Sequence, residues 1–139
     1  GRAETARMRV LVDTSVWSLA LRKDGPAGHP AVVKLADYLR SDEDVFLTGL
    51  ILQEILQAFR SEASFRQVAR HLEPFPLLAT GRPEAVAAAT LHRICAAKGV
   101  TASTADCQIA TAAIRHECLL LTADRDFERI AKWSALRLA

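Results

Sequence analysis

Long hydrophobic runs and a strong excess of one charge are both missing from this sequence. No apolar run approaches the ~20 residues that a membrane-spanning helix requires, and residues 1–7 contain no apolar stretch typical of a signal peptide. The 139 residues carry a net charge of only +2. A chain with so little basic excess would attract nucleic acid only through local patches. The sequence therefore predicts neither a membrane protein nor a generally basic one.

Cysteine is also scarce, and the three cysteines show no pairing pattern. Cys95, Cys107 and Cys118 are an odd number, lie far apart and form no C-x-x-C motif. Each sits among apolar residues, as buried reduced thiols do, and the four histidines show no zinc-ligand spacing relative to them. We therefore expect neither a disulfide framework nor a zinc site, and a reducing cytoplasm is the simplest compartment.

What the sequence does contain is typical of one globular domain. Half of its residues are hydrophobic and 24% are charged, which favours a folded domain over disorder. Met8 is the only methionine and directly precedes a strand-like run, so we interpret residues 1–7 as a cloning remnant or an unstructured leader. We predict a single domain over residues 8–139, with no internal repeat or interdomain linker.

Short apolar runs alternate with helical patterns along the chain. The runs at 10–12, 45–47 and 118–121 are typical of strands that are buried on both faces. Parallel pairing with right-handed crossovers then gives a fold of the α/β class, an α/β sandwich. We expect a loop at 24–30, an extended segment at 75–78, a last strand at 135–138, and helices at 16–21, 32–39, 49–60, 65–72, 82–98 and 101–116, with a short one ending at Lys132.

Carboxylates directly follow two of the predicted strands. Asp13 comes after the first strand, and Asp124 and Asp126 come after the third. The carboxyl ends of parallel strands share one edge of the sheet, where ligands bind in such folds, so we expect these side chains to lie close together. Taken singly, each aspartate is read more simply as a helix N-cap, and it is their shared position that indicates a functional site.

Two further acids occupy helical positions. Glu54 shares a narrow polar stripe with Gln53 and Gln57 on an otherwise apolar helix. A glutamate on a mostly buried helix is costly unless it is paired or bound to a cation; the alternative is a single exposed face. Asp106 follows Ser103 at capping-box spacing, but the helix beyond it is almost wholly apolar. This pattern predicts that the Asp106 carboxylate stands where a buried helix emerges at the same edge of the sheet.

Four or five acids gathered at one edge require a counter-charge, because ionised carboxylates repel one another. Mg²⁺ or Mn²⁺ would supply it, since both are hard cations that prefer carboxylate oxygens. Such a cation polarises a phosphodiester and activates a water molecule as the nucleophile. The sequence offers no Ser-His-Asp or Cys-His grouping, P-loop or glycine-rich dinucleotide turn as a competing centre.

Four motifs, in the expected order, resemble those of the PIN-domain ribonucleases. They are residues 10–17 (VLVDTSVW), Glu54 in the second motif, Asp106 with the Cys-Gln-Ile-Ala that follows it, and residues 121–127 (LTADRDF). The first and last motifs look most like those of the VapC toxins of bacterial type II toxin–antitoxin pairs. The resemblance runs from Met8 to the end of the chain.

This resemblance implies a PIN-like three-layer α/β/α sandwich with a central parallel sheet over residues 8–139. It also implies a Mg²⁺-dependent endoribonuclease, in which Mn²⁺ can substitute, acting as the toxin of such a pair and cleaving RNA by metal-activated water. The implied partners are an RNA substrate, a VapB-type antitoxin and a second copy of the chain. The acids carried over as metal-binding residues are Asp13, Glu54, Asp106 and Asp124; Asp126 could replace or support Asp124, and Thr14, Ser15 and Thr104 are candidates for contacts to the acids or to water.

Two other interpretations stay open at this stage. A phosphatase of the haloacid dehalogenase type also begins with an aspartate after a strand, but it needs a second aspartate two residues later, where this chain has Ser15. A non-catalytic PIN-like interaction module is the second, with an acidic cleft that binds a basic segment of a partner. The number of metal ions and the choice between Asp124 and Asp126 are also open.

Overall fold

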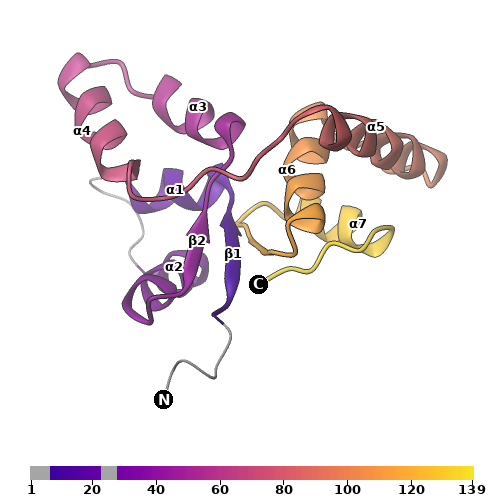
Figure 1. Cartoon of the computed structure of the whole chain (residues 1–139), viewed down its shortest axis with the longest axis horizontal. Coiled ribbons are helices and arrows are strands. Elements are labelled where there is room, and N and C mark those ends of the chain that lie inside the picture. Colours follow the sequence, from indigo (N-terminus) through magenta and orange to yellow (C-terminus); the bar gives the residue numbers. More distant parts are fainter. Residues whose placement is uncertain (1–6, 23–27) are drawn as a thin grey trace.

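A parallel sheet of three short strands forms the centre of the molecule (Figure 1). The structure is a computed structural model that describes residues 7–22 and 28–139, so most of the predicted loop at 24–30 and of the leader lies outside the described residues. Within them the strands are β1 (Arg9–Val12), β2 (Asp44–Phe46) and β3 (Leu119–Leu121), in the order β2-β1-β3. The three predicted strands are confirmed to within one residue at each end.

The central strand is buried because both of its neighbours and both layers of helices cover it. Val10 pairs with Val45 on one side and with Leu119 on the other, and the side chains of Val10, Leu11 and Val12 are completely buried. Burying each such side chain contributes roughly 1.5–3 kcal/mol. Because all three strands run in the same direction, their carboxyl ends lie at one edge of the sheet.

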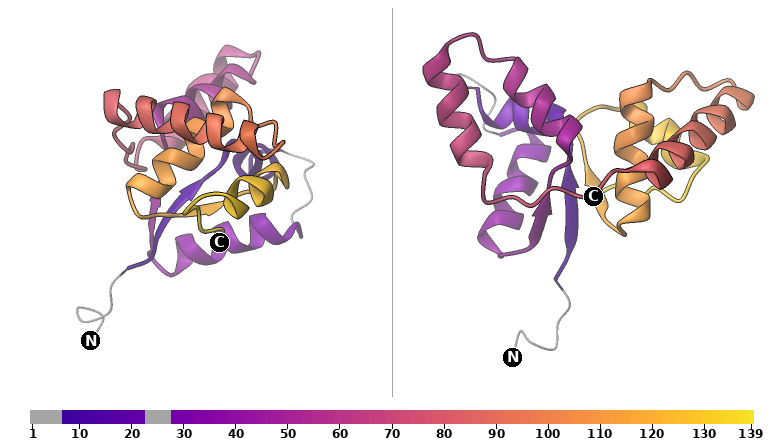
Figure 2. Two further views of the ribbon diagram at one scale, coloured as in Figure 1. Left: turned by 90° about the vertical axis from the view of Figure 1, so that its right-hand side faces the viewer. Right: turned by 45° about the horizontal axis from the view of Figure 1, so that its top comes forward.

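Helices cover both faces of the sheet, which confirms the α/β/α sandwich (Figures 1 and 2). None of the helices in the described segments is long and apolar enough to span a membrane. On one side lie α1 (Thr14–Ala20), α2 (Pro30–Arg40), α3 (Gly49–Gln57) and α4 (Glu62–Leu72). On the other side lie α5 (Arg82–Ala97), α6 (Thr104–Arg115) and α7 (Asp126–Lys132).

Two segments differ from the elements predicted for them. The helix expected from residue 101 begins at Thr104, because the Ser103 hydroxyl accepts a hydrogen bond from the Asp106 N–H at 3.0 Å and caps the helix there. The last strand expected at 135–138 is wrong as a regular strand. This segment meets β3 only around Leu120, where a single bridge to Leu138 forms, so it lacks the ladder that defines a strand.

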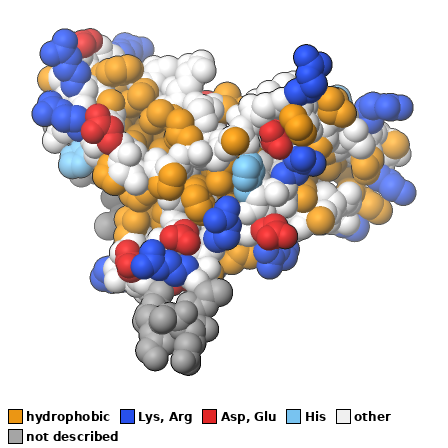
Figure 3. All heavy atoms as spheres, in the orientation of Figure 1, with side chains coloured by type: hydrophobic (Ala, Val, Ile, Leu, Met, Phe, Trp, Pro, Cys, Tyr) orange, Lys and Arg blue, Asp and Glu red, His pale blue; other side chains and the backbone are white. Residues whose placement is uncertain are grey.

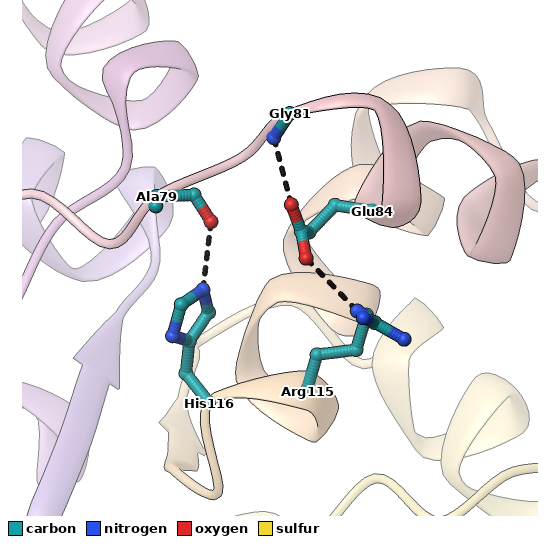
Figure 4. A network of polar contacts seen from close by, with 5 residues as sticks. All are labelled: Ala79, Gly81, Glu84, Arg115 and His116. Atoms are coloured by element: carbon teal, nitrogen blue, oxygen red, sulfur yellow. Dashed lines mark hydrogen bonds and ion pairs between the residues drawn. The ribbon is translucent and has the colours of Figure 1, made fainter.

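The segment between α4 and α5 crosses from one side of the molecule to the other. Polar contacts connect it to the end of α6 (Figure 4). Nε2 of His116 lies 2.7 Å from the Ala79 carbonyl oxygen. The Glu84 carboxylate accepts from the Gly81 N–H at 2.7 Å and from Nε of Arg115 at 2.9 Å. The Gly81 N–H and then Arg115 hold the pKa of Glu84 below its usual value. These contacts connect the start of α5 to the end of α6.

The three cysteines are buried free thiols, as the sequence predicts. Cys95 lies on α5 and Cys107 on α6, two helices that pack against each other. Burial raises the pKa of all three thiols, so they are less nucleophilic than exposed cysteines. We assign them to the core.

Candidate metal centre

Asp13 anchors the carboxyl edge of the sheet. It directly follows β1, its side chain is only 4% exposed, and it is the N-cap of α1. Its Oδ2 accepts a hydrogen bond from Oγ of Ser15 at 2.6 Å and one from Oγ1 of Thr122 at 2.9 Å. The simple capping interpretation is therefore incomplete, because Thr122 belongs to the loop after β3 and not to the helix that Asp13 caps.

The same two hydroxyls connect Asp13 to the loop that carries the next acid. Oγ of Ser15 accepts from the Ala123 N–H at 3.0 Å, and Oγ1 of Thr122 accepts from the Asp124 N–H at 3.0 Å. A buried charge and its hydrogen bonds thus fix the backbone of this loop. Thr122 is not among the residues predicted from the sequence, although its position directly after β3, at the same edge as Asp13, points to it.

One oxygen of Asp13 remains available to a ligand. All hydrogen bonds of the carboxylate in the described part of the chain go to Oδ2. No buried side-chain oxygen among the described residues lacks a hydrogen-bond partner, so Oδ1 must reach the surface. Asp13 therefore offers one oxygen at the floor of the site while the other holds the loop in place.

Three aspartates from two helices and a loop meet at this edge. Asp106 on the first turn of α6, Asp124 in the loop after β3 and Asp126 at the start of α7 each place one carboxylate oxygen within 4.8 Å of the others. Oδ1 of Asp124 also accepts the Asp126 N–H at 2.9 Å, which sets the spacing between these two. The sequence left Asp124 and Asp126 as alternatives, and the structure brings both to the cluster.

The electrostatics of the cluster are unfavourable without a cation. The pKa of Asp106 rises from 3.8 to about 6, first because partial burial removes hydration and next because Asp124 and Asp13 repel its charge. Asp126 adds to this repulsion, and the hydrogen bond with Ser103 opposes it only in part. A positive charge placed among these oxygens would remove the repulsion.

Glu54 joins the site through a hydrogen bond to Thr14, the residue after Asp13. Oγ1 of Thr14 donates to Oε1 of Glu54 at 2.7 Å. The polar stripe predicted on α3 is present, with Gln53 and Gln57 exposed and joined at 3.4 Å. The expectation of a mostly buried helix is wrong, because the buried residues of α3 are confined to one narrow face. Glu54 is half-buried beside Thr14, outside the group of three close carboxylates.

Thr104 faces a different part of the molecule. It is the exposed first residue of α6 and lines a hollow of about 380 Å³ between α5 and α6, together with Ala88 and His92. Within the described residues no hydrogen bond joins its hydroxyl to an acid of the cluster. Of the three hydroxyl residues singled out from the sequence, Thr14 and Ser15 contact the acids and Thr104 does not.

The donor set fits a hard divalent cation. Carboxylate oxygens within 4.8 Å of one another can share an ion that binds oxygen at about 2.0–2.6 Å. Histidine and cysteine ligands, which softer metals prefer, are absent from the group of three. The raised pKa of Asp106 and the accessible Oδ1 of Asp13 are both consistent with a site that binds a cation.

Fold and site together define an α/β sandwich protein with an acidic, metal-compatible centre at the carboxyl edge of its parallel sheet. A family model described as the PIN domain matches residues 10–132. The chain therefore belongs to the PIN domain family.

Several solved structures share the fold of this chain. The chain shares 22% identity and a TM-score of 0.70 with FitAcB from Neisseria gonorrhoeae, over 93% of this chain and 95% of that one. It shares 15% identity and a TM-score of 0.76 with VapBC2 from Rickettsia felis bound to a DNA fragment from its promoter, over 95% and 98%. It shares 18% identity and a TM-score of 0.76 with DNA-bound VapBC from Salmonella typhimurium, over 95% of this chain and 97% of that one. At these identities the similarity establishes the fold.

Proposed function

We propose that this protein is a divalent-metal-dependent endoribonuclease and the toxin of a toxin–antitoxin pair. The proposal rests on the close approach of three carboxylates, those of Asp106, Asp124 and Asp126. They lie at the same edge of the sheet as Asp13, whose hydrogen bonds use only one of its two carboxylate oxygens. An acidic cluster at the carboxyl edge of a parallel sheet is where such a fold places its chemistry. The PIN domain motifs favour a phosphodiester substrate over other substrates of metal-assisted hydrolysis.

The residues have different parts in this proposal. The cation, Mg²⁺ or Mn²⁺, would be held by Asp106, Asp124 and Oδ1 of Asp13. Asp126 would support Asp124, because the backbone N–H of Asp126 donates a hydrogen bond to Oδ1 of Asp124. When bound, the cation polarises a phosphodiester and lowers the pKa of a water molecule. Glu54, fixed by Thr14, stands at the rim, where it can orient water.

The proposal assigns the activation of water to the cation and not to a histidine. In the described chain, His116 lies at the opposite end of α6 from Asp106, against the Ala79 carbonyl. His29 caps α2, where Nδ1 accepts the Ala31 N–H at 3.1 Å, and it lines a hollow that also includes Thr122 and Asp124. In this proposal the protein's own contribution to hydrolysis is to gather and orient oxygens, which requires that the supporting hydroxyls of Ser15 and Thr122 hold them in place.

The test of activity is cleavage of single-stranded RNA with and without Mg²⁺. Wild type should cleave with Mg²⁺ and stop with a chelator, and Asp106→Asn and Asp124→Asn should each lose at least about 100-fold in rate. Asp42→Asn is the matched control, because Asp42 is 82% exposed in the turn before β2, at the other edge of the sheet. Metal-independent cleavage, or full activity in both site variants, would overturn the proposal.

The proposal includes an antitoxin that acts at the same carboxylates. An arginine of the antitoxin could pair bidentately with acids of the cluster and substitute for part of the metal's charge. Antitoxin and metal would then weaken each other by the same factor. Affinity of a candidate antitoxin peptide should fall on adding Mn²⁺ and in Asp106→Asn. If neither changes it, inhibition works at another surface.

The proposal also includes a homodimer that uses the face of α3 and α4. Hydrophobic side chains gather over these helices in Figure 3. Leu52, Leu56 and Phe59 are only partly buried, and Phe65 on α4 is 39% exposed. This apolar surface is larger than the core requires, and a second copy would cover it. Light scattering across micromolar concentrations distinguishes dimer from monomer.

A further inference from the structure

An exposed tryptophan with two lysines lies on the same side of the sheet as α6 and the acid cluster, and neither the PIN motifs nor the metal centre includes it. Trp133 directly follows α7 and remains 37% exposed. Nζ of Lys98 lies 4.8 Å from the centre of its ring, and Nζ of Lys132 lies 5.3 Å from it. We call these three residues the Trp133 cluster.

Neither ammonium group of this cluster is neutralised by a carboxylate. Within residues 7–22 and 28–139, Lys98 and Lys132 appear in no ion pair, whereas several exposed arginines do. Both ammonium groups lie over the Trp133 ring, so an anionic partner with a flat apolar face can attract a lysine to its own charge and take the place of that lysine against the ring. A single strand of nucleic acid has both features, since its bases stack on aromatic rings and its phosphates bind lysines.

The Trp133 cluster is connected to the acid cluster along two elements. Helix α7 begins at Asp126 and ends just before Trp133, which is about 10 Å along the helix axis at ~1.5 Å per residue. Lys98 ends α5, and a short connection leads from it to Ser103 and the first turn of α6, where Asp106 lies. A span of ~10 Å corresponds to about three stacked nucleotides at ~3.4 Å each.

We propose that Trp133 stacks on a base of the RNA about three nucleotides or fewer from the bond that is cut, while Lys98 and Lys132 contact the neighbouring phosphates. This inference rests on the proposed function and adds to it a positioning site for the substrate strand. Stacking accepts any base, so the Trp133 cluster holds the strand in register and leaves sequence choice to other contacts. Trp133 does not touch the reacting atoms and is a positioning residue.

The fluorescence of Trp133 itself can be used to detect this contact. It has two tryptophans, and the other, Trp17, is 5% exposed in the core with its Nε1 donating to the Val12 carbonyl at 3.2 Å. With a chelator present to prevent cleavage, a short oligouridylate should quench the fluorescence of Trp133 and leave that of Trp17 unchanged. Trp133→Phe should abolish the quenching but keep affinity within about threefold, because phenylalanine still stacks.

Affinity variants separate RNA binding from a purely structural contact between α5 and α7. Trp133→Leu should weaken oligouridylate binding roughly 5- to 30-fold, and should raise KM for cleavage by a similar factor with kcat unchanged. Lys98→Gln and Lys132→Gln should each reduce the salt slope of log affinity by about 0.7. Arg40→Gln is the matched control, because Arg40 ends α2 at the amino end of β2. These lysine variants also keep the test valid if Trp133→Leu does not fold.

The outcomes distinguish this inference from the proposed function. Wild-type cleavage of RNA together with unchanged affinity in Trp133→Leu and unchanged salt slopes would overturn the Trp133 site and leave the nuclease proposal intact. The Trp133 site would also be overturned if oligouridylate bound to the protein without quenching the fluorescence of Trp133. Conversely, RNA binding that depends on Trp133 in a protein that cleaves nothing would support the site and reject the nuclease.

Discussion

Replacing Asp106 by asparagine should make the metal-free protein more stable, although it removes a residue that we assign to the functional site. Asp106 is half-buried and faces Asp124, Asp13 and Asp126, and together burial and repulsion raise its pKa from 3.8 to about 6. The folded state therefore holds the ionised carboxylate at a cost that the unfolded state does not have. Asparagine keeps the shape of the side chain and its backbone N–H bond to Ser103 but carries no charge.

The size of the effect follows from the pKa. The difference between 3.8 and about 6 corresponds to about 3 kcal/mol at most, and partial exposure to water screens this to about 1 kcal/mol. For a domain of this length, about 1 kcal/mol raises Tm by about 3 °C. The sign also depends on pH. Because the folded pKa is the higher one, the penalty is complete above about pH 6, shrinks as pH falls toward the unfolded pKa of 3.8, and is lost below that pH, where both states are protonated.

Thermal denaturation followed by circular dichroism provides the assay. In chelator at neutral pH, Asp106→Asn should melt about 3 °C above wild type, and the difference should vanish as pH falls below about 3.5. Added Mg²⁺ should stabilise wild type more than the variant, because only wild type has the complete site. Asp42→Asn, an exposed acid outside the site, should match wild type throughout. A variant that is no more stable than wild type in chelator would refute the electrostatic reasoning.

The other predictions concern single contacts. Thr14→Val removes the 2.7 Å bond to Glu54 and should slow single-turnover RNA cleavage several-fold while costing about 1 kcal/mol in urea denaturation; an unchanged cleavage rate would remove Glu54 from the site. Arg115→Met should raise the pKa of Glu84 toward its ordinary value, because one of the groups that lower it is lost, and NMR titration of the carboxyl carbon would detect no change if backbone hydrogen bonds alone were responsible. Phe65→Asp should give a folded monomer by light scattering, since it places a charge on the apolar face of α3 and α4; a stable dimer would place the interface elsewhere.

Much of the fold and part of the site could be predicted from short-range patterns. The run at 10–12 is apolar and bounded by a polar cap, so both β1 and the position of Asp13 at its end follow from local sequence. The capping-box spacing from Ser103 to Asp106 likewise places this acid on the first turn of α6, although the helix was expected to begin at residue 101. These features depend on neighbours within a few residues, which a sequence displays directly.

The features that were missed depend on contacts between distant elements. Thr122 supports Asp13 across two strands, and Lys98 meets Trp133 across two helices, so neither contact has a local signature. The expected strand at 135–138 failed because its apolar pattern is compatible with one bridge to Leu120 as well as with a full ladder. Periodicity tells which face is apolar but not how much of it a neighbour covers, and for this reason α3 was predicted to be more buried than it is.

Diffraction from crystals soaked in Mn²⁺ shows whether the acid cluster is a metal centre. Anomalous scattering locates the ion independently of any assay of activity. We expect a peak about 2 Å from carboxylate oxygens of Asp106 and Asp124, which disappears in Asp106→Asn crystals and persists in Asp42→Asn crystals. A crystal with no peak at this cluster, or with manganese bound only elsewhere on the chain, would contradict it.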